Sequence, residues 1–259
     1  MNGTYQPVIE VSGLRRAFGG LVAVNDLGFS VARGEILGLF GLVGAGRSEL
    51  MKLLYGAEPL ASGAIRFDGV PFHARDPRAA IAAGLALCPE DRKAEGIVPL
   101  AAVAENITLA RRNLRSRKGP FVDRGDEARQ AEDLIASMRV KTASPATAIA
   151  TLSGGNQQKA IIARWLAADA RILLMDEPTR GIDVGARSEI YAHIYRLAEE
   201  GRTILFASSD MPEVMGVADR IVVMREGGVA GILTRDEATP ERLLRLALPD
   251  AAARPNPAL

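Results

Sequence analysis

The chain is poor in the features that mark secreted and membrane-spanning proteins. It contains a single cysteine, Cys88, among 259 residues, so a framework of disulfides within the chain is excluded. Cys88 lies in the apolar run LALC, and we expect a buried strand thiol there rather than a reactive one. The longest uncharged apolar runs, 36–46 and 79–89, have eleven residues each, whereas a membrane-spanning helix needs about 20. The first residues lack the basic and apolar segments of a signal peptide, so we expect neither a span nor a leader.

An excess of charge of either sign is also absent. Lys and Arg number 32 against 31 Asp and Glu, which gives a net charge of +1. This balance argues against a dedicated nucleic-acid-binding protein, although it leaves room for a local basic patch. Apolar residues make up 48% of the chain, so disorder throughout is excluded. The length fits one large domain or two small ones.

Short apolar runs alternate with longer segments of helical pattern. Several runs are continuously apolar, as in strands buried on both faces, and we predict strands at residues 8–11, 36–40, 84–88, 171–176, 203–207 and 220–224. Between them, Asp76 and Pro77 start a predicted helix that ends before a glycine. Asp210 and Glu213 form a predicted capping box, and residues 184–200 show helical spacing. The alternation predicts an α/β fold with a largely parallel sheet.

Residues 91–150 lack a strong buried-strand run, and we predict a mostly helical insertion there. The insertion contains a basic cluster made of Arg111, Arg112, Arg115, Arg117 and Lys118. We expect a solvated surface loop at this cluster; contact with anionic lipid or with a membrane protein is the alternative. The two histidines of the chain, His73 and His193, are expected to be structural.

The apolar run 36–40 leads directly into a glycine-rich loop and then into a helical pattern. Gly41 to Ser48 matches the phosphate-loop spacing G-x-x-x-x-G-K-[ST], except that Arg47 stands at the lysine position. Glycines let backbone N–H groups turn toward phosphate oxygens, and the N-terminus of the following helix favours an anion. The Ser48 hydroxyl would bind Mg²⁺. Arg47 keeps the positive charge but replaces a compact ammonium by a wide planar group; a chance match to the motif is the alternative.

A second candidate element of the site is RILLMDEP, in which apolar strand residues precede two acids. Asp176 stands at the expected carboxyl end of the strand and would hold Mg²⁺ through water. Glu177 follows it and would accept a proton from an attacking water. A strand that merely ends in solvated acids is the simpler alternative, but the phosphate loop upstream argues against it.

Between these elements lies LSGGNQQK, residues 152–159, at the head of a helical pattern. In this order, the phosphate loop, LSGGNQQK and ILLMDEP resemble the motifs of ATP-binding cassette (ABC) ATPases, and the resemblance extends over about residues 8–248. The strings FGLVGAGRSEL, LCPEDRKAEGI, DEPTRGIDVGA and FASSDMPEVMG further resemble the C-terminal cassette of the two-cassette ATPases of monosaccharide importers. Arabinose importers are the most similar of these, while ribose, xylose and galactoside importers share most of the strings.

The resemblance implies a fold. The fold class is α/β: a P-loop NTPase with a RecA-like, mostly parallel sheet core, an antiparallel N-terminal β part and an inserted helical subdomain. Residues 1–248 would form one nucleotide-binding domain, with the core in 1–90 and 160–248 and the helical subdomain in about 91–159. Residues 249–259 are expected to form a frayed tail.

The family motifs also imply ligands for ATP and Mg²⁺. Phe18 would stack on adenine, and Ser48 and Asp176 would hold Mg²⁺. The phosphates would be cradled by Gly41, Gly44, Ala45, Gly46, Arg47, Ser48 and Glu49. The γ-phosphate held by an opposite cassette would be contacted by Ser153, Gly154 and Gly155.

The same resemblance implies partners and a location. A second ABC cassette, identical or different, would pack head to tail against this one. ATP binding and hydrolysis by the pair would then drive a transmembrane sugar permease. A periplasmic sugar-binding protein would take part indirectly, and no nucleic acid is involved. The chain would lie peripherally on the cytoplasmic face of the inner membrane.

Three positions depart from the usual cassette pattern, and all three concern the γ-phosphate and the attacking water. Arg47 replaces a lysine, Glu90 stands where most cassettes carry a glutamine that senses Mg²⁺ and water, and Ser209 stands where most carry a histidine. A hydroxyl supplies neither the charge nor the reach of an imidazole. We therefore expect Glu177, Glu90 and Ser209 at the catalytic positions of a site that hydrolyses ATP weakly, beside an intact signature motif.

Two functions remain open from the sequence. The chain is either the ATPase subunit of a monosaccharide importer or a cassette that binds nucleotide and donates its signature to a competent partner while hydrolysing little. An ABC protein of DNA repair is disfavoured because there is no room for a long coiled-coil insert, and translation members usually carry tandem cassettes. Importer ATPases of this type are nearly twice this length, so an isolated half, a split gene product and an excised domain all remain open.

Overall fold

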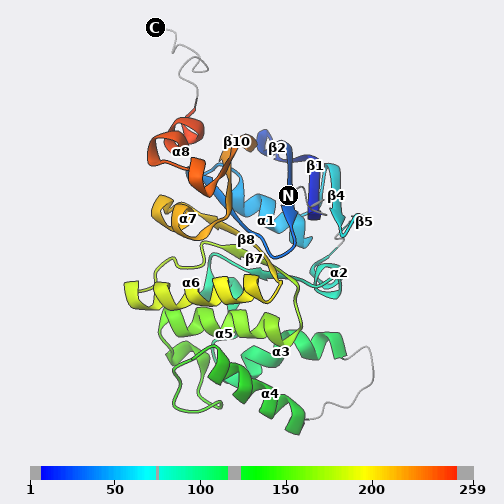
Figure 1. Cartoon of the computed structure of the whole chain (residues 1–259). Coiled ribbons are helices and arrows are strands. Elements are labelled where there is room, and N and C mark those ends of the chain that lie inside the picture. The colour runs from blue at the N-terminus through cyan, green and yellow to red at the C-terminus, as the bar shows by residue number, and fades with distance from the viewer. Residues whose placement is uncertain (1–6, 74–75, 116–123, 250–259) are drawn as a thin grey trace.

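The computed structural model describes residues 7–73, 76–115 and 124–249. A four-stranded sheet that contains the N-terminal strands adjoins a six-stranded sheet, and the helices of residues 103–167 form a separate layer at the far end of the molecule (Figure 1). Within the described ranges, no helix is long and apolar enough to cross a membrane.

The six-stranded sheet forms the core, and its strands are β3 (Ile36–Gly41), β6 (Leu85–Cys88), β7 (Ile172–Asp176), β8 (Thr203–Ser208), β9 (Arg220–Arg225) and β10 (Gly228–Thr234). In space they follow the order β10-β9-β3-β8-β7-β6, and every pair is parallel except β10 with β9. Strands β3, β7 and β8 are buried along their whole length. The continuous apolar runs therefore predicted these strands correctly, because a parallel sheet is covered on both faces.

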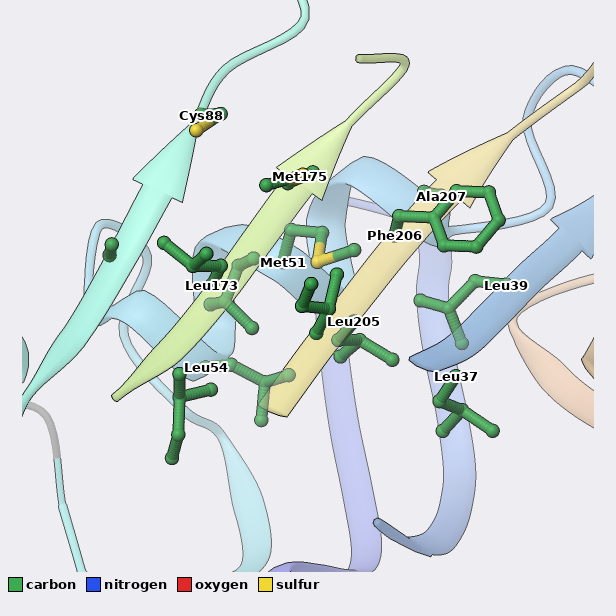
Figure 2. Close-up of a cluster of buried hydrophobic side chains, with 14 of the residues drawn as sticks. Leu37, Leu39, Met51, Leu54, Cys88, Leu173, Met175, Leu205, Phe206 and Ala207 are labelled. Atoms are coloured by element: carbon green, nitrogen blue, oxygen red, sulfur yellow. The ribbon is translucent and has the colours of Figure 1, made fainter. Parts of the chain in front are cut away.

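Helix α1 (Arg47–Tyr55) packs on this sheet through its apolar side. Figure 2 shows Met51 and Leu54 of α1 beside Leu173 of β7 and Leu205 of β8, and all four side chains are fully buried. Burial of one such side chain stabilises the fold by about 1.5–3 kcal/mol. The sheet also contacts three helices of the C-terminal half, α6 (Val184–Glu199), α7 (Met211–Val217) and α8 (Pro240–Ala247).

The four-stranded sheet is antiparallel and consists of β1 (Pro7–Phe18), β2 (Leu21–Ala32), β4 (Ser62–Phe67) and β5 (Val70–Phe72) in the order β2-β1-β4-β5. The antiparallel N-terminal part implied by the family resemblance is thus confirmed. The residue pattern alone predicted a strand only at residues 8–11. Strand β4 escaped because its buried positions alternate with exposed ones, which gives a weaker signal than a continuous apolar run. Strand β5 has only three residues.

Most of the remaining chain is helical. The elements are α2 (Pro77–Ala82), the π-helical turn η1 (Arg92–Gly96), α3 (Val103–Arg115), α4 (Arg124–Ser137), α5 (Gly154–Ala167) and the 3₁₀ turns η2 (Ile149–Thr151) and η3 (Arg235–Glu237). Helices α3, α4 and α5 pack together in the layer below the sheet (Figure 1). Residues 91–150 are therefore mostly helical, as predicted, and the predicted subdomain boundary at 159–160 falls inside α5.

Two consecutive side chains anchor helix α5: Arg164 holds it to η1 and α3, and Trp165 holds it to the sheet. Arg164 is buried and donates to the carbonyl oxygens of Gly96 at 2.8 Å and Asn106 at 2.7 Å. The same burial lowers the pKa of Arg164. The indole N–H of Trp165 donates to the carbonyl oxygen of Leu87 in β6 at 3.0 Å. The helical layer and the core thus meet along α5.

Cys88 and His193 have the structural roles predicted for them. Cys88 is fully buried at the end of β6, and burial raises the pKa of its thiol to about 12. His193 is buried on α6, where a ring nitrogen lies 3.0 Å from the carbonyl oxygen of Met138, and burial lowers its pKa. His73 is exposed.

The basic cluster was predicted to lie in a surface loop, but its first residues lie in a helix. Arg111 and Arg112 lie in the last turns of α3 and form ion pairs with Asp126 and Glu127 of α4, at 2.8 and 2.9 Å. The cluster continues the helix because these two arginines are held by the acidic first turn of the neighbouring helix. Arg117 and Lys118 lie outside the described residues, as do residues 250–259 of the predicted tail.

Candidate functional site

The phosphate-loop motif joins β3 to α1, and steric contacts require its glycines. Gly46 has a φ of 93°, in the left-handed region that favours glycine, and a side chain on it would collide with the Ala23 carbonyl oxygen. A Cβ on Gly41 would lie 2.7 Å from the Met224 carbonyl oxygen and 2.8 Å from the Ala45 Cβ. The chain therefore turns tightly after β3, and the loop presents the N-terminus of α1, the end of a helix that favours an anion.

A cleft of about 440 Å³ lies at this loop. The predicted site residues that line it are Gly44, Ala45, Gly46, Arg47, Ser48, Glu49, Glu90, Glu177 and Ser209. The fold thus brings together four segments that are far apart in the sequence. Phe18, Gly41 and the signature residues 153–155 are not among the residues that line this cleft.

Asp176 and Ser48 lie side by side at the base of the loop. Asp176 ends β7 and is buried, and the Ser48 side chain hydrogen-bonds to its carboxyl group. Burial raises the pKa of Asp176, an effect that this hydrogen bond opposes. Among the described residues no group of three or more His, Cys, Asp or Glu side chains is placed to hold a metal. A cation here would take most of its ligands from phosphate and water, which is the usual arrangement for Mg²⁺.

Glu177 is held in a fixed orientation by its own backbone. Its φ is 46°, a conformation that costs a non-glycine residue energy and is commonest at functional sites. Its N–H donates to the Ala207 carbonyl oxygen at 2.9 Å. Its carboxylate accepts the backbone N–H of Ser209 at 2.8 Å, so Ser209 touches the candidate base through the main chain and not through its hydroxyl.

Each arginine of the cleft forms an ion pair within the chain. The pairs are Arg47 with Glu177 at 3.2 Å, Arg187 with Asp210 at 3.3 Å, and Arg180 with Glu90. Arg180 is further fixed because its carbonyl oxygen accepts a hydrogen bond from Arg92 at 2.8 Å. Glu90, which was predicted as a catalytic residue, is therefore paired with Arg180, three residues after Glu177.

Glu213 is a site residue that the sequence analysis assigned to another role. The predicted capping box is only half formed: Asp210 accepts the Glu213 N–H at 3.3 Å, but the Glu213 carboxylate does not reach back. Instead the carboxylate is buried and accepts the hydroxyls of Thr179 at 2.8 Å and Ser208 at 2.5 Å. Burial raises the pKa of Glu213. It thus joins the turn after Glu177 to the turn after β8, and only its place in the fold reveals this.

The signature residues form the start of α5 and do not line the cleft, although a Cβ on Gly154 would lie 3.3 Å from the carbonyl oxygen of Gly181, which does. Ser153 precedes the helix, and its hydroxyl oxygen accepts the side-chain amide of Asn156 at 2.9 Å. A Cβ on Gly155 would lie 2.6 Å from the Cβ of Ala186 in α6, so close packing requires glycine there. A Cβ on Gly154 would lie 3.2 Å from the Arg92 guanidinium. The turn thus consists of small residues and presents the N-terminus of a helix.

Phe18 lies at the end of β1, with part of its ring exposed. The guanidinium carbon of Arg16 lies 4.6 Å from the ring centroid, a favourable cation–π distance. Arg16 is itself held by Glu58 at 3.0 Å. One face of the ring is therefore covered by a side chain that has its own anchor.

The comparisons with known proteins agree with this geometry. The family described as "ABC transporter" matches residues 24–180. The chain is 53% identical over 243 residues to the arabinose import ATP-binding protein AraG of Pseudomonas syringae pv. tomato, covering 94% of this chain and 47% of the relative. The protein of the same name from Paraburkholderia xenovorans is 51% identical over 252 residues, 97% of this chain and 49% of the relative. The chain thus spans about half the length of the curated relatives it matches.

Solved structures support the fold at lower sequence identity. A nucleotide-free ATP-binding cassette from an ABC transporter superposes with a TM-score of 0.79 at 18% identity, covering 94% of this chain and 100% of that one. An ABC transporter cassette in its ADP conformation gives a TM-score of 0.77 at 19% identity, with 93% and 98% covered. The predicted fold, a P-loop NTPase with a parallel core and inserted helices, is confirmed. The family match over more than half of its length shows that the chain belongs to the ABC transporter family, and its fold is that of the ATP-binding cassettes in the solved structures.

Proposed function

We propose that this chain is the ATP-binding and ATP-hydrolysing cassette of an importer for monosaccharides, with an arabinose-like sugar as cargo. It would couple ATP binding and hydrolysis to uptake through a permease. The names of the relatives, which are twice as long, support the cargo. The test is uptake of labelled L-arabinose, ribose and xylose by vesicles that contain the transporter assembled with this cassette. Uptake of none of the three would contradict the proposal.

The observation that carries the nucleotide site is the cleft at the phosphate loop, which Ser48 lines, with the buried Asp176 directly behind Ser48. The backbone of Gly44 to Arg47 would bind phosphate oxygens, and Ser48 and Asp176 would hold Mg²⁺, which when bound supplies positive charge to those oxygens. Phe18 would stack on adenine through the ring face that Arg16 leaves open. Glu177 would orient a water and take its proton.

Titration of the chain with a fluorescent ATP analogue and Mg²⁺ tests this site. Binding should saturate, and Ser48→Ala should weaken it because the loop loses its hydroxyl ligand. Arg245→Ala, on α8 and far from the loop in sequence, serves as the control and should leave the affinity unchanged. Absence of binding up to about 1 mM, equivalent to about −4 kcal/mol, would mean that Arg47 closes the loop to phosphate.

A second candidate is a cassette that hydrolyses little itself and serves mainly as a signature donor. It is favoured by the state of the three departing positions: Arg47 pairs with Glu177, Glu90 pairs with Arg180, and Ser209 offers only its backbone. Steady-state turnover by the pure chain should therefore stay below about 1 per second, the low end of ordinary enzymes. If turnover exceeds that rate and Glu177→Gln abolishes it, the cleft of this chain is a working catalytic site.

The proposed partners follow from the same arrangement. A second cassette would present its nucleotide to Ser153, Gly154 and Gly155, and the pair would drive a transmembrane sugar permease. A periplasmic sugar-binding protein would deliver the sugar, and the chain would lie on the cytoplasmic face of the inner membrane as a peripheral subunit. Co-purification with a tagged permease tests this: the chain should elute with the permease and separate from it only in detergent that dissociates the complex.

A further inference from the structure

The cleft contains more carboxyl side chains than is expected of a site that binds phosphate. Its lining contains three arginines, but also five carboxyl side chains: Glu49, Glu90, Glu177, Asp210 and Glu213. Every one of the three arginines is already paired with one of these acids. Within the described part of the chain, every arginine that a phosphate would meet in this cleft already has a carboxylate as its partner.

The pair between Arg47 and Glu177 is the one that matters for the loop. Their side chains are 10% and 11% exposed, so solvent and salt screen the pair less than a surface pair. The Arg47 Nη1 atom that approaches Glu177 is buried and has no aligned hydrogen bond. The contact is therefore a single charge contact and not the two-pronged geometry that arginine forms best. Phosphate oxygens can offer that better geometry.

The two partners differ in how far they can move. Glu177 is fixed by its left-handed backbone, by its N–H to Ala207 and by the Ser209 N–H that its carboxylate accepts. Arg47 stands in the first turn of α1, and its Nη1 atom has the ion pair with Glu177 but no hydrogen bond, so its long side chain is the less restrained partner. When phosphate binds the loop, the guanidinium must therefore leave the carboxylate, since the carboxylate has no freedom to follow.

We infer that Glu177 is a resident counter-ion for Arg47, and that it sets the nucleotide affinity of this cleft by competing with phosphate for the guanidinium. The inference rests on the proposed nucleotide site. It gives Glu177 a role in binding that is separate from proton transfer, and it predicts that removing the carboxylate strengthens binding of a nucleotide that cannot be hydrolysed.

The test is isothermal titration with ADP in the absence of Mg²⁺, for the full chain and for Glu177→Gln, Arg47→Met and the double variant. ADP is chosen because it has no γ-phosphate to be repelled directly by Glu177, and because it excludes hydrolysis. Glu177→Gln should bind ADP about tenfold more tightly, a change of about 1.4 kcal/mol. In the Arg47→Met background, Glu177→Gln should raise the affinity for ADP by less than about threefold, because no guanidinium is left for the carboxylate to hold. Glu200→Gln removes a surface partner of Arg196 and should leave the affinity unchanged.

Each outcome decides between explanations. An equal gain in both backgrounds overturns the inference, because it would come from direct repulsion of phosphate by Glu177. No gain, or weaker binding, in Glu177→Gln also overturns it. Failure of all four proteins to bind ADP up to about 1 mM would overturn the proposed nucleotide site itself, and the inference with it. If far-ultraviolet circular dichroism shows that Arg47→Met does not fold, Arg47→Gln takes its place in the cycle.

Discussion

The cleft at the phosphate loop and the turn at Ser153–Gly155 are the two surfaces on which the proposed nucleotide chemistry depends, and they are built differently. The cleft contains three arginines, each paired with a carboxylate of the same chain. The turn has no ionisable side chain of its own and consists of a serine and two glycines. The departures from the family pattern, at Arg47, Glu90 and Ser209, all fall in the cleft.

This difference shows where a cassette tolerates change. In the cleft, a carboxylate such as Glu90 is balanced by an arginine supplied from another segment, Arg180. At the turn, a Cβ on Gly155 would lie 2.6 Å from the Cβ of Ala186, and no change of charge elsewhere relieves such a contact. If the two surfaces are independent, a substitution at one leaves the other unaltered.

The largest expected effect is that of Gly154→Asp on the assembled transporter. The new carboxylate would face the γ-phosphate of the opposite cassette, and like charges in a partly desolvated site cost several kcal/mol. ATP turnover of the reconstituted complex should fall about a hundredfold, or about 2.7 kcal/mol. The nucleotide affinity of the isolated chain should stay within about twofold of the original, because the cleft is untouched.

Gly154→Ala is the matched control for that experiment. Its Cβ would lie 3.2 Å from the Arg92 guanidinium and 3.3 Å from the Gly181 carbonyl oxygen, contacts that a shift of a few tenths of an ångström relieves. It should therefore retain most of the turnover. If Gly154→Asp has no effect on the complex, the signature of this chain does not serve a working site.

Gly155→Ala should lower the stability of the chain. The added methyl would press α5 against Ala186 of α6 at 2.6 Å, and overpacking of this kind costs about 1–3 kcal/mol. Urea unfolding should show a lower free energy of unfolding. Gly185→Ala, in the first turn of α6 with only a 3.4 Å contact to the Asp183 side chain, should leave stability the same or raise it by up to about 1 kcal/mol. Equal stability of the two variants would contradict the packing role.

Glu213→Gln should change how stability depends on pH. Burial raises the pKa of Glu213 above its unfolded value of 4.5, so the folded state holds the proton more tightly than the unfolded state. Stability from this group is fully present below pH 4.5 and is lost as the pH rises through the folded pKa. The difference in unfolding free energy between the two proteins should therefore shift in favour of Glu213→Gln from pH 4.5 to 7. Urea titrations at the two pH values measure it, and a constant difference would show that the carboxyl titrates as in water.

The smallest effect is expected from Arg47→Lys. A lysine restores the usual residue of the loop, but Glu90 and Ser209 stay unmatched, so turnover by the complex should change less than about threefold. ATPase assays on the same preparation as the Gly154→Asp experiment provide the comparison. A strong increase with Arg47→Lys would place the working site in this cleft and not at the turn.

The sequence predicted the order of the motifs and five of the six strands of the core sheet, all but β10, because both depend on local pattern. Runs such as 36–40 and 203–207 are apolar at every position and became strands buried on both faces. Strand β2 escaped notice because Asn25 and Asp26 interrupt it, and its place depends on pairing with β1. That helix α3 continues through Arg111 and Arg112 was missed for a related reason. The ion pairs that hold these residues come from α4, which is too distant in the sequence for a local pattern to include.

The charge pairing in the cleft was beyond the reach of local reasoning. Glu90 and Arg180 are ninety positions apart, and nothing in the strings CPED and DEPTR says that they meet. Glu213 fits the capping-box spacing after Asp210, yet its carboxylate turns to Thr179 and Ser208. The pattern gave the correct helix start and the wrong partner, because the Asp210 N–H donates to the Ser208 hydroxyl at 3.0 Å instead of to Glu213.

The anchoring of α5 by Trp165 gives the molecule an optical reporter of its own. Trp165 is the single tryptophan of the chain, is 6% exposed, and bonds to β6 through its indole N–H. Its neighbour Tyr55 of α1 lies edge-on, with ring centroids 6.2 Å apart. Tryptophan fluorescence therefore reports on a single place in the molecule, the contact between the helical layer and the sheet. A rotation of that layer that breaks the bond to Leu87 would shift the emission to the red, whereas a movement confined to the phosphate loop would leave the spectrum unchanged.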